Sequence, residues 1–122
     1  MSMGFLSLLS NAIGALRSFE VVKNIAPNKI GVYIMYHNGE VKYIGRAIED
    51  RHGQSTKGLR KRLQEHWRGS HTGKPELHKY RNELMVKIIT CDSVQEAKET
   101  EARLIRQHDT VNNGWNLRYE DY

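Results

Sequence analysis

The sequence predicts an α+β domain, in which helices flank a small antiparallel sheet of about three strands and an extra amphipathic helix stands at the N-terminus. Three observations predict this class. An aromatic and β-branched run at residues 30–36 leads through Asn38-Gly39 into a second apolar run, which is typical of a β-hairpin. Apolar residues with helical spacing come after the hairpin. They come a second time after a third strand-like run at residues 85–89.

Residues 1–28 are predicted to form a leader to a domain that spans residues 29–122. The apolar side chains of the leader recur at steps of three and four, as on one face of a helix: Phe5, Leu8, Leu9, Ala12, Ile13 and Leu16. We expect this face to pack on the domain itself. The alternatives are a protein partner, self-association or a membrane surface.

The hairpin is predicted from residues 30–36 as the first strand and residues 41–44 as the second. Asn38 and Gly39 between the strands tolerate positive φ, which favours a tight type I′ turn. Residues 47–57 then form a polar loop of turn-forming and charged residues.

The first helix after the hairpin is expected to be capped by Ser55 or Thr56 and to end near Gly69. Its apolar stripe steps by four residues: Leu59, Leu63 and Trp67. A proline in the first turn favours a second, short helix over residues 75–82.

The last predicted elements are a strand and a long helix. Residues 85–89 are expected to form the third strand. Ser93 with Glu96 three residues later forms a capping box that opens a helix to about His108. The triplet Asn-Asn-Gly at residues 112–114 then predicts a turn.

Positive charge is concentrated in one stretch of the chain. The net charge is +5, with a pI of about 9.4. Residues 55–82 contain eight Lys and Arg against two Glu, whereas the remainder holds eleven basic and twelve acidic residues. A protein that binds a phosphate backbone shows this distribution. The alternative is a solvated basic helix face.

The sequence also indicates a compartment. The single cysteine, Cys91, excludes an internal disulfide and is compatible with a reducing environment. No run of residues approaches the ~18 uninterrupted apolar residues of a membrane span. We therefore expect a cytoplasmic protein.

One carboxylate lies on the predicted inward face of the long helix. That face is defined by apolar spacing and comprises Val94, Ala97, Leu104, Ile105 and His108. Glu101 lies within it, and a buried carboxylate is costly unless it meets a cation or hydrogen-bond donors. The alternative is that Glu101 lies at the edge of the stripe, where it reaches water or pairs with an arginine.

Two further pairs of residues stand out. Arg62 and His66 are four residues apart on the basic helix and project from one face, where arginine can hold a phosphate and imidazole can pass a proton. Tyr33 and Tyr43 are expected near opposite ends of the face that the two hairpin strands share. A solvated arginine, a half-buried histidine and tyrosines that serve in packing are the alternatives.

Together these residues resemble the GIY-YIG nuclease domain family over about residues 30–117. The motifs that carry the resemblance, in chain order, are Gly31-Val32-Tyr33, Tyr43-Ile44-Gly45, Arg62 with His66, Glu101, and Gly114-Trp115-Asn116. Gly31 and Gly45 are the structural glycines of the two tripeptides. The resemblance implies an endonuclease that hydrolyses phosphodiester bonds in DNA, in repair or restriction, with RNA as an alternative substrate.

The resemblance also implies roles for the site residues. Glu101 would hold one divalent ion, Mg²⁺ or Mn²⁺, and Arg62 would stabilise charge on the phosphate. Tyr33 would be the general base, with His66 accepting its proton. Tyr43 would orient water or phosphate, and Asn116 would anchor the tail.

Five basic residues are expected to contact nucleic acid: Arg46, Lys57, Lys61, Arg68 and Lys74. Two alternatives to an independent nuclease stay open. One is a catalytically idle nucleic-acid-binding module. The other is a nuclease subunit of a larger repair, restriction or mobile-element complex.

Overall fold

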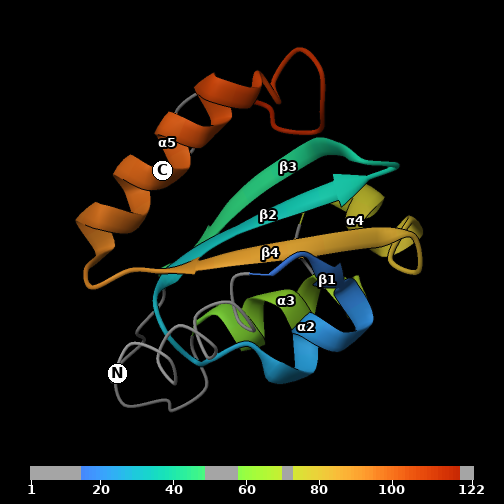
Figure 1. Ribbon diagram of the computed structural model, residues 1–122, viewed down its shortest axis with the longest axis horizontal. Helices are drawn as coiled ribbons and strands as arrows, with labels where there is room; N and C mark the ends of the chain where they lie inside the picture. Colours follow the sequence, from blue (N-terminus) through green and yellow to red (C-terminus); the bar gives the residue numbers. More distant parts are fainter. Residues whose placement is uncertain (1–14, 49–57, 70–72, 119–122) are drawn as a thin grey trace, which may run out of the picture.

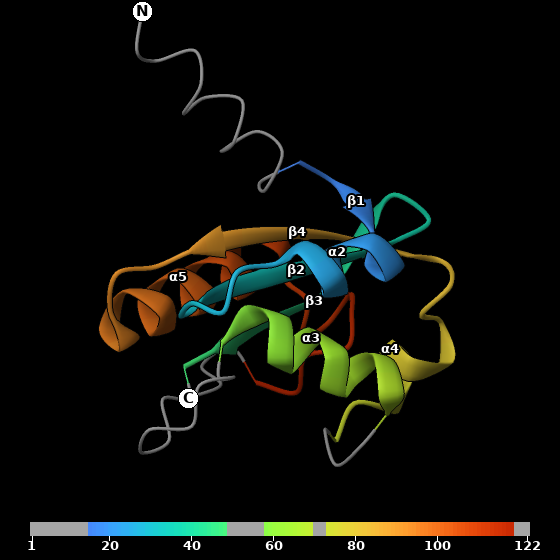
Figure 2. The same cartoon turned by 90° about the horizontal axis from the view of Figure 1, so that it is seen from below.

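The computed structural model describes residues 15–48, 58–69 and 73–118. A four-stranded antiparallel sheet with the order β1-β4-β2-β3 lies between α5 on one face and α2 and α3 on the other (Figures 1 and 2). The predicted α+β class is confirmed, with one strand more than the three expected. Strand β3 forms one edge of this sheet.

The bounds of the elements follow the predicted order along the chain. The strands are β1 Arg17–Ser18, β2 Gly31–His37, β3 Glu40–Ala47 and β4 Leu84–Thr90. The helices are α2 Phe19–Ile25, α3 Leu59–Arg68, α4 Pro75–Lys79 and α5 Val94–His108. Helix α4 is shorter than expected, because Tyr80 leaves the helical region and caps it.

The hairpin turn forms as predicted and sets the register of β2 and β3. Asn38 and Gly39 have φ values of 53° and 81°, the positive values that a type I′ turn requires. The resulting register places Tyr33 opposite Gly45 and Met35 opposite Tyr43. Because side chains alternate along a strand, these residues share one face of the sheet.

The sheet separates two apolar cores. The core on the α3 side is built from buried residues of α2, α3, α4 and the sheet: Phe19, Val22, Tyr33, Met35, Tyr43, Leu59, Leu63, Leu77, Leu84, Val86 and Ile88. The core on the α5 side contains Val32, Ile34, Ile44, Cys91, Ala97, Leu104 and Ile105. Cys91 is a small buried core residue, as expected for a free thiol in an apolar run.

The start of α3 differs from the prediction. The helix begins at Leu59 with Gly58 as its N-cap and has no side-chain cap, while Ser55 and Thr56 lie outside the described residues. Backbone carbonyls cap it instead, since Lys29 accepts from the Leu59 N–H at 3.0 Å and Pro27 from Arg60 at 3.3 Å. Capping from a distant segment leaves no signature in the local sequence.

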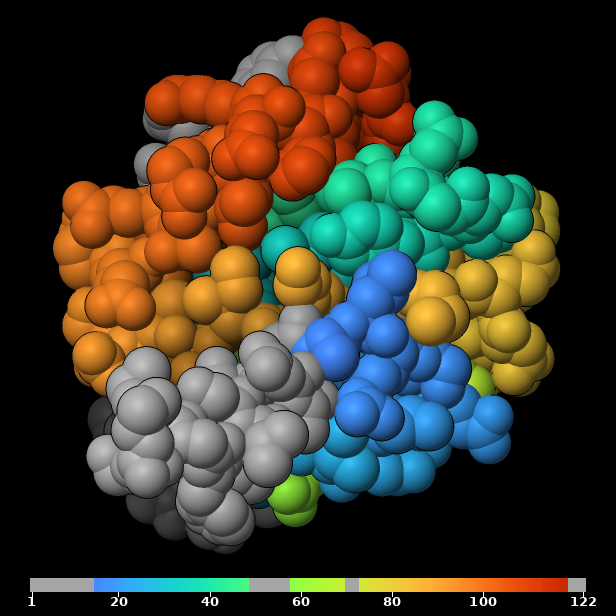
Figure 3. Space-filling model, viewed as in Figure 1, coloured from blue at the N-terminus to red at the C-terminus, as the bar shows by residue number. Residues whose placement is uncertain are grey.

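The N-terminal boundary also differs from the expectation. Residues 17–26 supply the edge strand β1 and helix α2, whose Phe19 and Val22 are buried in the core, although we expected the domain to start at residue 29. Figure 3 shows this segment, in blue, on the surface beside the start of β4, with which β1 pairs. A two-residue strand is too short to give an alternating pattern. The amphipathic helix predicted from Phe5 lies almost entirely outside the described residues.

The inward face of α5 matches the prediction in its middle but not at its ends. Ala97, Glu101, Leu104 and Ile105 are buried, whereas Val94 is 37% exposed. Val94 is the first residue of the helix, and His108, its last residue, is partly exposed. None of the helices in the described part of the chain has the length and apolar character needed to cross a membrane.

Candidate active site

Tyr33 is buried in the α3-side core and lies against the backbone of Gly45, its partner across the hairpin. A Cβ atom at residue 45 would overlap the hydroxyl and the outer ring carbons of Tyr33. Gly31 is needed for a similar reason, because a Cβ there would meet the Ile89 carbonyl and the Leu59 side chain. Both motif glycines therefore allow close packing around Tyr33 and the start of α3.

His66 on α3 is completely buried and lies 2.7 Å from Tyr33, measured from Nε2 to the hydroxyl oxygen. Among the described residues, none is within hydrogen-bonding reach of its Nδ1. An orphaned buried N–H is rare, so this favours the tautomer in which Nε2 carries the hydrogen and donates it to Tyr33. Burial, together with the positive charges of Arg62 and Lys74, lowers the pKa of His66 to about 3. The ring is therefore neutral at physiological pH.

Tyr43 and Arg62 complete the group around the Tyr33 hydroxyl. The rings of Tyr33 and Tyr43 are 6.1 Å apart between centroids, so the expectation that they lie near opposite ends of the face is wrong. The register makes them diagonal neighbours. Burial raises the pKa of Tyr33 to about 12, while the charge and hydrogen bonding of Arg62 oppose that rise.

Lys74 links this group to the C-terminal segment. Its Nζ lies 5.2 Å from the centroid of the Tyr43 ring and donates to the Trp115 carbonyl at 3.0 Å. The ammonium is thus held over an aromatic face, a favourable cation–π arrangement. The sequence predicted Lys74 only as a nucleic-acid contact, because nothing in its neighbourhood along the chain indicates Tyr43.

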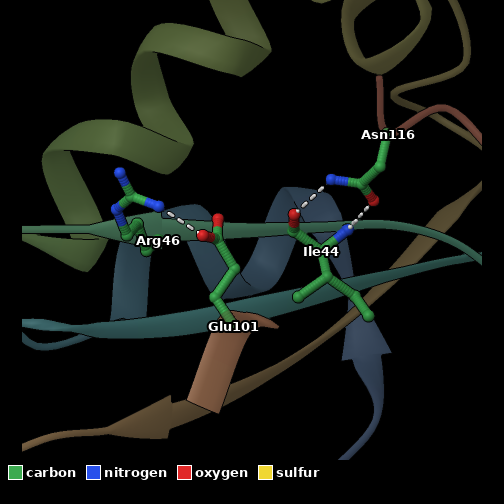
Figure 4. A network of polar contacts seen from close by, with 4 residues as sticks. All are labelled: Ile44, Arg46, Glu101 and Asn116. Atoms are coloured by element: carbon green, nitrogen blue, oxygen red, sulfur yellow. Dashed lines mark hydrogen bonds and ion pairs between the residues drawn. The ribbon is translucent and has the colours of Figure 1, made fainter. Parts of the chain in front are cut away.

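Glu101 lies on the other side of the sheet, on α5, with its side chain only 4% exposed. The guanidinium of Arg46 on β3 forms an ion pair and hydrogen bond with this carboxylate (Figure 4). Arg46 alternates with Gly45 along β3 and therefore faces α5 rather than α3. This contact matches the alternative in which Glu101 pairs with an arginine, although the carboxylate is buried rather than at a solvated edge.

The two groups meet around β3, the edge strand. Tyr33 reaches β3 from one face across Gly45, and Glu101 reaches it from the other through Arg46. The negative charge of Glu101 adds to the burial that raises the pKa of Tyr33. Residues from β2, β3, α3 and α5 thus converge on one edge of the sheet.

Asn116 anchors the C-terminal segment to β3. Its side-chain amide donates to the Ile44 carbonyl and accepts from the Ile44 N–H, both at 2.9 Å (Figure 4). The Thr110 hydroxyl also donates to Asn116 Oδ1, at 2.7 Å. Sequence reasoning missed Thr110, since a threonine six residues before an asparagine carries no signal. The three residues are buried, which makes this a satisfied polar cluster in the α5-side core.

The predicted nucleic-acid contacts are distributed unevenly. Arg68 is exposed and Lys61 is partly exposed, both on α3, whereas Lys57 lies outside the described residues. Arg46 is 11% exposed and is engaged by Glu101. The geometry therefore brings Arg46 to the carboxylate and leaves α3 to present basic side chains to a ligand.

A divalent cation fits the donor set around Glu101. In residues 15–48, 58–69 and 73–118, no group of three or more His, Cys, Asp and Glu could hold a metal ion. A single carboxylate suits Mg²⁺, which keeps several water ligands and takes one or two protein carboxylates. The buried Glu101 carboxylate supplies such an oxygen donor, and in the metal-free protein the guanidinium of Arg46 balances its charge.

Solved structures of an endonuclease domain have a fold similar to that of this chain. The GIY-YIG N-terminal endonuclease domain of UvrC from Thermotoga maritima, bound to magnesium as its catalytic divalent cation, is 26% identical to this chain. The match covers 75% of this chain and 90% of that domain, with a TM-score of 0.58. A point mutant of the same domain, bound to its catalytic divalent cation, also matches at 26% identity, covering 75% and 89%, with a TM-score of 0.58.

These matches define the class of domain. The chain has the fold of the GIY-YIG nuclease domain, as the sequence motifs predicted. Neither a scan of protein-family models nor a search of curated proteins finds a match to the chain.

Proposed function

We propose that this protein is a divalent-metal-dependent endonuclease that hydrolyses phosphodiester bonds in DNA. One observation carries the proposal, namely that the buried Glu101 carboxylate and the buried Tyr33–His66 pair lie against the same edge strand, through Arg46 on one face and Gly45 on the other. The two side chains come from opposite faces of the sheet and meet at its β3 edge. Even when paired with Arg46, a buried carboxylate is weak evidence for added stability, so a catalytic use explains the position of Glu101 better.

The residues fit one bound divalent ion, Mg²⁺ or Mn²⁺. Glu101 would hold it as the single protein carboxylate. When bound, the ion supplies positive charge that stabilises the leaving oxygen of the scissile phosphodiester. The catalytic divalent cation bound to the similar UvrC domain, magnesium in one of its structures, supports this assignment.

Arg62 is suited to stabilise the negative charge that grows on the phosphate. Its guanidinium lies beside the Tyr33 hydroxyl, and it can form two parallel hydrogen bonds to phosphate oxygens. Interactions that are stronger in the transition state than in the ground state accelerate the reaction. Arg62 would therefore contribute to the rate more than to affinity.

Tyr33 is proposed to take the proton from the attacking water. In the free protein its pKa of about 12 keeps it a neutral phenol. Arg62 lowers this pKa, and a hydrogen bond donated by neutral His66 to the phenol oxygen also favours the phenolate. His66 thus orients Tyr33 and stabilises its anion. A proton-accepting role, expected from the sequence, is unfavourable for a ring whose pKa is about 3.

The remaining parts of the proposal concern substrate and setting. Lys61 and Arg68 on α3 offer phosphate contacts, and Tyr43, held by Lys74, would orient the water or the phosphate. DNA is the proposed substrate because the similar domain belongs to an endonuclease, and repair or restriction is the proposed setting. A buried free thiol at Cys91 supports the reducing environment of the cytoplasm. The predicted N-terminal helix is the proposed surface for a protein partner or self-association.

The test is nicking of supercoiled plasmid by the purified full chain in Mg²⁺ or Mn²⁺, with the variants Glu101→Gln and Glu99→Gln. Gln keeps the shape and helix propensity of Glu but lacks its charge. Glu99 is exposed on the same helix, so Glu99→Gln controls for a lost carboxylate. Wild type and Glu99→Gln should nick DNA, and Glu101→Gln should lose activity.

EDTA should abolish nicking by the wild type. Nicking by Glu101→Gln at the wild-type rate would remove Glu101 as the metal ligand. Retardation of DNA without nicking by the wild type in either metal would instead support the idle binding module.

A further inference from the structure

Arg46 is part of the site in a way that the sequence did not indicate. It was predicted as a nucleic-acid contact, yet its guanidinium is paired with Glu101 (Figure 4). The side chains of Arg46 and Glu101 are 11% and 4% exposed, so the pair is shielded from water. A shielded ion pair interacts much more strongly than one at the surface.

The same carboxylate is the proposed metal ligand, and this inference rests on that role. A guanidinium and a divalent cation that share one carboxylate repel each other at close range. Mg²⁺ also needs its ligand oxygens directed at itself with nearly ideal octahedral geometry. The Glu101 oxygen that accepts from Arg46 is engaged in the metal-free protein.

We infer that Arg46 holds Glu101 in the metal-free protein and leaves the carboxylate when a divalent ion binds. Arg46 is then an internal competitor of the metal, and it sets the metal affinity of the site. While no metal is bound, Arg46 keeps the buried Glu101 carboxylate paired with a positive charge. The exchange replaces one cation at Glu101 by another, so the carboxylate is compensated in both states.

The test is a titration of the full chain with Mn²⁺ in which electron paramagnetic resonance measures the free ion. The variant is Arg46→Met, which keeps the length and apolar stem of the side chain without the charge. Arg60→Met is the matched control. It removes the same charge, but the Arg60 side chain donates to the Ala26 carbonyl, at 2.7 Å, rather than to Glu101. Glu101→Gln reports whether Glu101 is the ligand.

The expected result is that Arg46→Met binds Mn²⁺ roughly tenfold or more tightly than the wild type, as removal of a close like charge predicts. Arg60→Met should bind as the wild type does. Unchanged or weaker binding by Arg46→Met, with wild-type binding intact and Glu101→Gln binding lost, would overturn the competition while leaving the proposed function standing. Wild-type affinity in Glu101→Gln would overturn both.

A second measurement uses the wild-type protein, because Arg46→Met removes a buried ion pair and can lower stability. The Nε–H resonance of Arg46, assigned by its absence in Arg46→Lys, is followed by NMR during titration with Mg²⁺. Loss of the carboxylate partner should shift this resonance and leave that of Arg60 in place. An Arg46 resonance that is unmoved at Mg²⁺ saturation would overturn the inference.

Discussion

The Tyr33 hydroxyl and His66 Nε2 lie 2.7 Å apart and form a buried polar contact between β2 and α3. Both side chains are enclosed by apolar residues of the α3-side core. The contact therefore joins the two elements at the point where the proposed chemistry takes place. Because the imidazole is buried, its neutrality is also a condition for stability.

Stability should fall on acidification in a way that depends on His66. Burial lowers its pKa from 6.5 to about 3, so below pH 6.5 the unfolded chain binds a proton that the folded chain does not. The stability that depends on a neutral His66 is complete above the pKa of the unfolded chain. It is lost as the pH falls toward the pKa of the folded protein. Thermal melting between about pH 7 and pH 4 should show a smaller decrease for His66→Gln than for the wild type.

His108→Gln is the control for the loss of a histidine outside the site. Carboxylates also lose their native interactions in acid, and they do so equally in all three proteins. Parallel melting curves for wild type and His66→Gln over this pH range would contradict the assigned burial of a neutral imidazole.

Gly45→Ala should reduce both stability and cleavage. The added methyl group would overlap the Tyr33 hydroxyl and ring, so the phenol must move. Overpacking of this kind costs about 1–3 kcal/mol. Thermal melting and plasmid nicking measure the two effects.

Gly39→Ala is the matched glycine control. Residue 39 has open space around its Cβ position, so only its φ of 81° strains alanine, at about 1–2 kcal/mol. We therefore expect Gly39→Ala to lower the melting temperature about as much as Gly45→Ala does, and to nick DNA normally. Normal nicking by Gly45→Ala would show that the place of the phenol does not matter.

Arg62→Ala should lower the cleavage rate at saturating DNA by about a hundredfold or more, with little change in DNA affinity. One phosphate contact among several changes affinity little, whereas charge growing in the transition state loses its partner. Single-turnover kinetics and gel retardation separate the two quantities.

Lys61→Ala, one residue away on the same helix, should show the opposite pattern. Its affinity should decrease and depend less steeply on salt, with the rate at saturation preserved. If Arg62→Ala behaves in the same way as Lys61→Ala, Arg62 is a binding residue only.

Asn116→Ala should destabilise the fold and weaken the site indirectly. The change leaves the Ile44 N–H and carbonyl and the Thr110 hydroxyl without their partner inside the α5-side core. Each buried group left unsatisfied costs about 1–3 kcal/mol. The melting temperature should fall markedly, and nicking well below the melting temperature should be slower.

Asn112→Ala serves as the control, because the Asn112 side chain is exposed and donates to the nearby carboxylate of Asp109. A melting temperature near that of the wild type is expected for it. Equal melting temperatures for the two variants would show that the Asn116 cluster does not anchor the segment.

Local patterns in the sequence predicted most of the helices and strands and the residues that we propose for the site. The hairpin follows from Asn38-Gly39 and its flanking strands, and the start of α5 follows from Ser93, whose hydroxyl accepts from the Glu96 N–H at 3.0 Å. These features depend on residues close together in the chain, so local propensity suffices. The spacing within α5 likewise predicted that Glu101 faces inward.

Tertiary structure decided the rest. The backbone carbonyls that cap α3 come from residues 27–29, which are distant in the sequence. Strand β1 is a strand only because it pairs with β4. The sequence showed that Glu101 needs a partner but not that Arg46 supplies it. Ion pairing and desolvation depend on neighbours in space, so the Arg46 contact and the low pKa of His66 arise only when β3, α3 and α5 are packed together.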